Sequence, residues 1–124
     1  MAKTILIVED DIFLQGLEAT RLKKEGYDII VASNGVEAFT ILDGKRQVEM
    51  ILLDLMLPGI DGFTVLEKFR AEKMYEKTPV IVFSNLSEEK DINRAKQLGA
   101  NEFFVKSNFT LDEISAKIKE TIGV

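Results

Sequence analysis

The sequence predicts an α/β protein in which five strand–helix units form a doubly wound, five-stranded parallel sheet. Short apolar runs recur along the 124 residues and alternate with segments that carry helical signals. The runs are nearly continuous in apolar residues, as in parallel strands that are buried on both faces. Strands that alternate with helices in this way give a sheet covered by helices on both sides. The runs are ILIV at 5–8, DIIVA at 28–32, MILLD at 50–54, PVIVF at 79–83 and EFFV at 102–105.

The segments between these runs contain start and stop signals of helices. Two of the candidate N-caps precede a glutamate by three residues, which is the spacing of a capping box. Glycines lie where two of the helices should end. In the last segment, apolar residues recur at spacings of three and four, on one face of an amphipathic helix. The candidate caps are Asn34, Thr110 and Ser87, the glycines are Gly26 and Gly99, and the apolar face is Leu111, Ile114, Ile118 and Ile122.

Composition argues against several classes of protein. The net charge of −5 makes nucleic acid an unsuitable direct partner, because phosphate contacts need a cationic surface. The chain has no cysteine and no histidine, which excludes thiolate chemistry, a Ser-His-Asp triad and imidazole metal ligands. The longest run without a charged residue, 78–87, is too short to span a membrane, and the N-terminus lacks a signal-peptide profile. We therefore expect a single cytoplasmic domain, residues 1–124, that does not contact a membrane.

Polar side chains follow four of the five expected strands at their carboxyl ends, the edge where ligands bind in such sheets. Clustered carboxylates at one edge need a hard cation, and Mg²⁺ suits oxygen ligands of this kind. A carboxylate beside that ion can attack phosphorus, while a lysine and a hydroxyl hold phosphoryl oxygens. Taken singly, each residue also has an ordinary interpretation as a helix cap, a turn residue or a surface charge. The residues are Glu9, Asp10 and Asp11 after the first strand, then Asp54, Ser84 and Lys106.

Four motifs in this order resemble the receiver domain of bacterial two-component response regulators, the family that includes the chemotaxis receiver. They are ILIVEDD (5–11), ILLDLMLPGIDG (51–62), PVIVFSNLS (79–87) and GANEFFVK (99–106). The resemblance covers essentially the whole chain, and the intervals between Asp10, Asp54, Ser84 and Lys106 are also similar to those of the family. It implies a flavodoxin-like sheet with the strand order 2-1-3-4-5.

The resemblance implies a role for each residue that matches the family pattern. Asp54 is expected to be the phosphoacceptor, and Glu9 and Asp10 the acidic pair that binds Mg²⁺, Asp10 directly and Glu9 through water. Met56 is expected to offer its backbone carbonyl to the ion. Asp11 is expected to face solvent or to cap the following helix.

Ser84 and Lys106 match the phosphate-sensing hydroxyl and the lysine of the family. Phe103 falls at the switch aromatic, although a core residue beside Phe104 is an equally good interpretation. The chain departs from the family at Ser107, where proline after a cis peptide bond is usual; we expect either a trans bond with a shifted loop or a strained cis bond. It also departs at Asn85, whose amide is bulkier than the small residue common there.

The implied function is that of a signalling switch rather than a turnover enzyme on an external substrate. A histidine kinase or a histidine phosphotransfer protein would donate the phosphoryl group in trans, and the domain would catalyse its own phosphorylation and dephosphorylation. A downstream protein would bind the face formed by the fourth helix, the fifth strand and the fifth helix. We expect a monomer or a weak phosphorylation-dependent dimer. The side chains of Met56 and Leu86, both apolar, would flank the site and slow the loss of the phosphoryl group.

Three other functions use a related fold. A phosphohydrolase of the haloacid-dehalogenase type needs a second acid two residues after its aspartate, where this chain has Met56. A flavodoxin-type flavin site needs a Ser/Thr/Gly-rich loop after the first strand, whereas EDDIF would repel phosphate in the absence of a metal. A receiver-like scaffold that docks partners independently of phosphorylation remains the main alternative.

Overall fold

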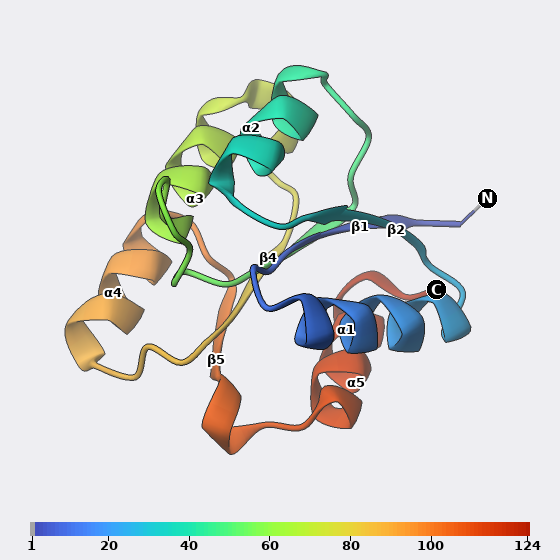
Figure 1. The fold of residues 1–124 in the computed structure, drawn as a ribbon. Helices are drawn as coiled ribbons and strands as arrows, with labels where there is room; N and C mark the ends of the chain where they lie inside the picture. The colour runs from blue at the N-terminus through green and yellow to red at the C-terminus, as the bar shows by residue number, and fades with distance from the viewer. Residues whose placement is uncertain (1) are drawn as a thin grey trace.

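One parallel sheet runs through the middle of the molecule (Figure 1). The computed structural model describes residues 2–124. The strand order is β2-β1-β3-β4-β5 and every pairing is parallel, so the predicted sheet and the implied order are both confirmed. The strands are β1 (Thr4–Val8), β2 (Asp28–Ala32), β3 (Met50–Leu53), β4 (Val80–Ser84) and β5 (Glu102–Val105).

Helices cover both faces of this sheet. α1 and α5 pack on one face, whereas α2, α3 and α4 pack on the other (Figure 1). Two short 3₁₀ turns, η1 (Lys73–Tyr75) and η2 (Lys106–Asn108), precede β4 and α5. The helices are α1 (Ile12–Lys24), α2 (Gly35–Asp43), α3 (Gly62–Ala71), α4 (Glu89–Gln97) and α5 (Leu111–Ile122).

No helix within residues 2–124 combines the length and the apolar character that crossing a membrane requires.

Both faces of the central strands are buried, which explains their continuous apolar sequences. In β1, Leu6 and Val8 pack in the core under α2, α3 and α4, while Ile5 and Ile7 pack in the core under α1 and α5. Each aliphatic side chain buried in this way contributes roughly 1.5–3 kcal/mol. A polar residue inside β1, β3 or β4 would lose this energy on one face or the other.

Most of the expected helix caps are present. Asn34 Oδ1 accepts a hydrogen bond of 2.8 Å from Glu37 N, and Thr110 forms a full capping box with Glu113. The prediction for Ser87 is wrong, because α4 begins at Glu89 with Glu88 as its N-cap, one residue later than a Ser87 cap requires.

The predicted helix ends and the apolar face of the last helix are confirmed. Gly26 and Gly99 follow α1 and α4 with φ of 102° and 109°, a conformation that glycine adopts without steric cost. All four residues of the expected apolar face pack on the core under α1 and α5.

Candidate functional site

The site lies where the carboxyl ends of β1 and β3 meet, at the switch point of the strand order. Val8 and Leu53 are paired in register, and Asp54 N donates a 3.0 Å hydrogen bond to Val8 O. Glu9 N donates a bond of 3.0 Å to Ala32 O on the other side of β1. These backbone bonds hold the residues that follow β1 next to the residue that follows β3.

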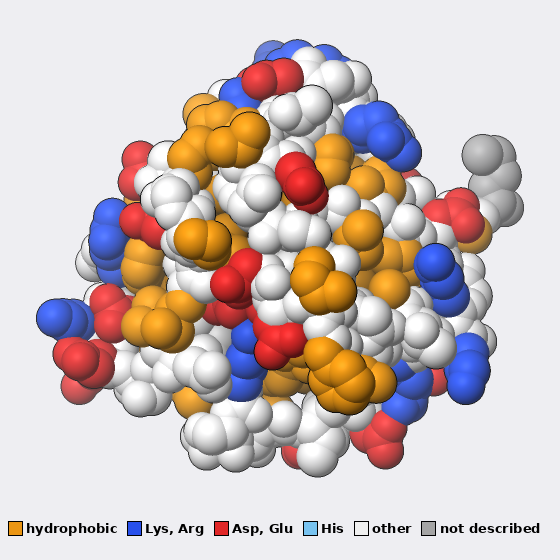
Figure 2. All heavy atoms as spheres, in the orientation of Figure 1, with side chains coloured by type: hydrophobic (Ala, Val, Ile, Leu, Met, Phe, Trp, Pro, Cys, Tyr) orange, Lys and Arg blue, Asp and Glu red, His pale blue; other side chains and the backbone are white. Residues whose placement is uncertain are grey.

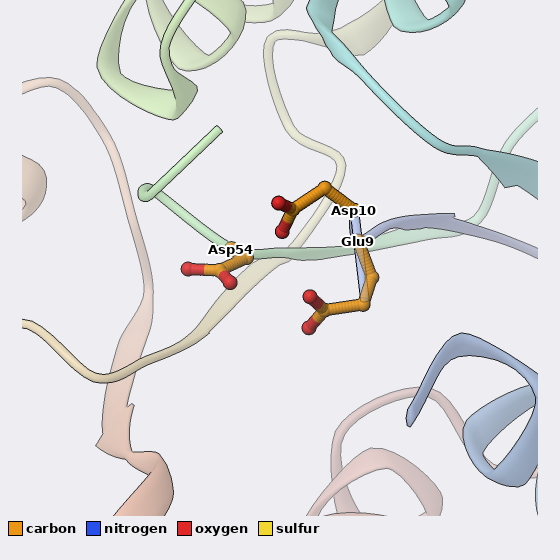
Figure 3. Close-up of side chains that lie close together, drawn as sticks. All are labelled: Glu9, Asp10 and Asp54. Carbon is orange, nitrogen blue, oxygen red and sulfur yellow. The ribbon is translucent and has the colours of Figure 1, made fainter. Parts of the chain in front are cut away.

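Three carboxyl groups converge at this point. The side chains of Glu9, Asp10 and Asp54 point toward one another, and ligand oxygens of the three lie within 4.8 Å of one another (Figure 3). Glu9 and Asp54 are buried, with 2% and 5% of their surface exposed, whereas Asp10 is exposed. Acidic side chains gather at the centre of the face drawn in Figure 2. Asp10 therefore lies on the side of the cluster that solvent reaches.

Lys106 brings a positive charge to the buried side of the cluster. Its Nζ lies 2.7 Å from Glu9 Oε1 and 2.7 Å from Asp54 Oδ2. The other oxygen of Asp54, Oδ1, accepts hydrogen bonds from Ser84 Oγ at 2.7 Å and from Met56 N at 3.0 Å. Both oxygens of Asp54 are thus hydrogen-bonded, which offsets the cost of burying this carboxylate.

The cluster perturbs its own ionisation. Burial raises the pKa of Glu9 to about 6, although its hydrogen bond with Lys106 acts in the opposite direction. Burial alone would lower the pKa of Lys106, but its hydrogen bonds to Asp54 and Glu9 outweigh this effect and raise it. Lys106 therefore stays cationic near neutral pH, where Glu9 is mostly ionised.

The donor set fits a divalent ion. Three carboxylates and one ammonium leave the ionised cluster with a charge of about −2, which a single divalent cation neutralises. Mg²⁺ prefers oxygen ligands and usually keeps several of its waters, so the exposed side at Asp10 suits it. No histidine or cysteine is present in the chain to favour a softer metal.

The structure brings together Glu9, Asp10, Asp54, Ser84 and Lys106, as the sequence predicted. Asp11 belongs elsewhere: it caps α1, where its Oδ1 accepts a bond of 3.1 Å from Leu14 N. The side chain of Met56 is 52% exposed.

Phe103 and Phe104 lie on opposite faces of β5. Phe103 is half-buried against the core under α2, α3 and α4, whereas Phe104 packs on the other core, in edge contact with Phe109. The interpretation of Phe103 as a core residue is thus compatible with the structure, although Phe103 and Phe104 pack on different cores because successive residues of a strand face opposite ways. The half-buried position leaves the switch role of Phe103 as a prediction.

No peptide bond within the described residues is cis, including those of the loop after β5. Lys106 and Ser107 are joined by a trans bond and belong to the 3₁₀ turn η2. The trans bond agrees with the first of the two expected alternatives, whose shifted loop stays a prediction. Asn85, the second departure, is exposed beside the site.

Sequence reasoning missed two residues near the site. Buried Gln15 donates hydrogen bonds of 3.0 Å to Glu9 O and to Ser33 Oγ, so it helps to hold the end of β1. Gly62 lies so close to the backbone of Asp54 that any Cβ there would overlap it. The spacing of seven residues between Gln15 and Leu22 was a signal for Gln15, since it places both on the buried face of α1. No sequence signal indicated the close approach of Gly62 to the backbone of Asp54.

Comparison with known proteins agrees with this geometry. The family model of the response regulator receiver domain matches residues 5–119. The chain is 34% identical over 119 residues to the alkaline phosphatase synthesis transcriptional regulatory protein PhoP of Bacillus subtilis, covering 96% of this chain and 48% of that protein. It spans about half the length of the first curated relatives it matches.

Two solved structures have the same fold at low sequence identity. A CheY-like receiver domain protein from Methanospirillum hungatei superposes with a TM-score of 0.89 at 25% identity, covering 98% of this chain and 94% of that one. The receiver domain of a sensor histidine kinase from Pseudomonas aeruginosa, with a magnesium ion coordinated in its active site cleft, superposes with a TM-score of 0.84 at 26% identity and full coverage of both chains. With the family model matching nearly its whole length, the chain belongs to the response regulator receiver domains of two-component systems.

Proposed function

We propose that Asp54 accepts a phosphoryl group from a phosphohistidine of a histidine kinase or a phosphotransfer protein. The observation that carries this proposal is the environment of Asp54, a buried carboxylate hydrogen-bonded by Ser84 and Lys106 and adjacent to Glu9 and Asp10. These 124 residues contain no histidine, so the donor histidine lies outside them. We take residues 1–124 as one receiver domain and, on the strength of the family alone, propose a cytoplasmic location.

The chain's own residues account for the positioning of the reactants. An oxygen of Asp54 forms the bond to phosphorus while the bond from phosphorus to the donor imidazole breaks, and the imidazole nitrogen keeps that electron pair. Lys106 then moves its hydrogen bond from the carboxylate to a phosphoryl oxygen, and the Ser84 hydroxyl turns to another. The burial of Asp54 strengthens these contacts, because they act away from bulk water.

Mg²⁺ is the cofactor that the donor set supports. Glu9, Asp10, Asp54 and the backbone carbonyl of Met56 would hold it, Glu9 through a water molecule. When bound, the ion supplies positive charge that offsets the charge of the phosphoryl oxygens. The Pseudomonas aeruginosa receiver domain, with a magnesium ion in its active site cleft, supports this assignment.

The output is a change of partner affinity. When Ser84 turns toward the phosphoryl group, the space beside it lets Phe103 move inward from its half-buried position on β5. The face formed by α4, β5 and α5 then changes shape, and a downstream protein binds it with altered affinity. Phosphorylation can drive this change only through contacts that differ between the two states. A monomer or a weak phosphorylation-dependent dimer suits such a switch.

The test is the intact mass of the protein after incubation with acetyl phosphate, with and without Mg²⁺. We expect the wild type to gain one phosphoryl group only when Mg²⁺ is present, and Asp54→Asn to gain none. Asp28→Asn, at an exposed aspartate of β2, is the matched control and should behave as the wild type. A gain that persists in Asp54→Asn would refute the acceptor. No gain under any condition would favour a scaffold that docks partners without phosphorylation.

A further inference from the structure

A second buried carboxyl group lies outside the site. Glu18, on α1, is 2% exposed, and its Oε1 accepts no hydrogen bond from any residue in the range 2–124. It lines a cavity of about 10 Å³ between α1, α5 and β3, whose other walls include the apolar side chains of Leu52, Leu111 and Ile114. A cavity of that size holds one water molecule at most. A carboxylate there would therefore be almost without hydration.

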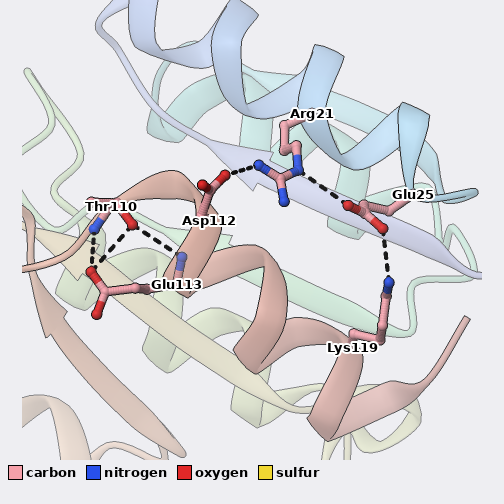
Figure 4. Close-up of polar contacts among 6 residues, drawn as sticks. All are labelled: Arg21, Glu25, Thr110, Asp112, Glu113 and Lys119. Carbon is pink, nitrogen blue, oxygen red and sulfur yellow. Dashed lines mark hydrogen bonds and ion pairs between the residues drawn. The ribbon is translucent and has the colours of Figure 1, made fainter.

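Polar contacts close α1 and α5 over this cavity. Arg21 of α1 pairs with Asp112 at the start of α5, and Lys119 of α5 pairs with Glu25 at the end of α1 at 2.9 Å (Figure 4). Arg21 also pairs with Glu25 at 3.2 Å, so this cation is already shared between two carboxylates. Arg21 lines the cavity, but its hydrogen bonds go to these two partners rather than to Glu18.

The charges that face Glu18 favour its neutral form. Burial is the largest effect, and it raises the pKa of Glu18 to about 8 together with the nearby carboxylates. Lys106 at the end of β5 acts in the opposite direction, and α5 contributes Ser115 rather than a cation to the cavity wall. Glu18 is therefore neutral near pH 7 and ionises only slightly above it. The carboxylates are Glu9 at the end of β1, Asp54 after β3 and Asp11 at the start of α1.

We propose that Glu18 is a proton-operated latch between α1 and α5. The two helices pack as observed while its carboxyl is neutral, and ionisation draws water into the interface and separates them. The reason is the size of the cavity: the ionised group needs several hydrogen bonds, and the closed interface has space for one water. Because α5 is part of the proposed partner-binding face, the latch would make that face sensitive to pH. The latch itself does not depend on phosphorylation of Asp54.

The first experiment compares unfolding in urea for the wild type and Glu18→Gln between about pH 6 and about pH 8. A pKa that moves from 4.5 in the unfolded chain to about 8 in the folded one makes the folded state lose protons later, so stability falls as pH rises through this range. The folding equilibrium constant of Glu18→Gln relative to the wild type should rise up to about fifty-fold. A rise below about twofold, the scatter of such measurements, would overturn the proposal.

Two controls keep this experiment decisive. Glu67→Gln changes an exposed glutamate of α3, and its free energy of unfolding should vary with pH as that of the wild type does. If Glu18→Gln does not fold, the same test uses Glu18→Met, together with direct NMR titration of the Glu18 carboxyl carbon in the wild type. A carboxyl that titrates near the ordinary value of 4.5 would overturn the proposal without any variant.

The second experiment measures the opening itself. The chain has no cysteine, so Ser115→Cys introduces a single thiol at the buried wall of the cavity. Its reaction with a thiol reagent should accelerate at least about tenfold on ionisation of Glu18, compared with the same thiol in Glu18→Gln at equal pH. Ala116→Cys, one residue along and exposed, should show no difference between the two backgrounds. Equal rates for Ser115→Cys in both backgrounds would mean that the interface stays closed, and would overturn the latch.

Discussion

Replacing Lys106 by methionine tests whether the ammonium holds the site together. The change keeps most of the length of the side chain but leaves Glu9 and Asp54 without the cation that lies 2.7 Å from each. The three side chains are 12%, 2% and 5% exposed, so little water can replace the lost charge. Breaking a buried ion pair costs about 3–5 kcal/mol. We expect about 3 kcal/mol near pH 8, because Glu9 can take up a proton and relieve part of the strain.

Urea unfolding in the presence of a chelator measures this loss. The pKa of Glu9 is already raised to about 6, and removal of Lys106 raises it further. The folded variant then binds more protons than the unfolded chain, so its stability falls as pH rises through the pKa of Glu9 and recovers below it. The deficit relative to the wild type should therefore be smaller near pH 5.5 than near pH 8.

Mg²⁺ should reduce the stability deficit of Lys106→Met relative to the wild type. Without the ammonium, the ionised cluster carries one more net negative charge, so a divalent ion binds the variant more tightly and stabilises it more than it stabilises the wild type. Lys117→Met is the matched control, since Lys117 pairs at the surface with Glu102 at 3.2 Å and should cost only about 0–1 kcal/mol. Equal losses for the two variants in chelator would refute the reasoning.

Three further predictions follow from local contacts. Asp11→Ala should lose about 1 kcal/mol of stability through the cap of α1 yet keep Mg²⁺ affinity within about twofold by calorimetry, and a large affinity loss would make Asp11 a ligand. Gly62→Ala should lose about 1–3 kcal/mol of stability or more in urea unfolding, because its methyl group overlaps the backbone after β3. Gly16→Ala, which has open space around it in α1, should instead gain about 0.5–1 kcal/mol. Similar stability changes for the two variants would contradict this prediction. Met56→Asn and Leu86→Glu should both lose the phosphoryl group faster than the wild type when the decay is followed by intact mass, because a polar side chain beside the site orients water. Equal decay rates for the three proteins would refute this prediction.

Local patterns were sufficient for most of the fold. The continuous apolar runs predicted strands buried on both faces, because only such strands need apolar side chains at every position. Thr110 and Glu113 predicted the start of α5, since a capping box is a contact between residues three apart. The carboxylates after β1 and β3 were predicted to meet because the carboxyl ends of parallel strands share one edge. The strand order came from the resemblance to the family rather than from any pattern in the residues.

The tertiary structure decided the rest, because it depends on distances between residues far apart in the chain. That Lys106 pairs with both Glu9 and Asp54 required the register of β1, β3, β4 and β5. The failed cap at Ser87 depended on how the chain leaves β4. The burial of Glu18 was not readable from the sequence, since the apolar residues Ile12 and Phe13 of α1 are exposed. Only the packing of α5 showed that Glu18 is buried and that its Oε1 accepts no hydrogen bond from residues 2–124. Burial and pairing depend on two surfaces that come into contact. A local sequence pattern describes only one of these two surfaces.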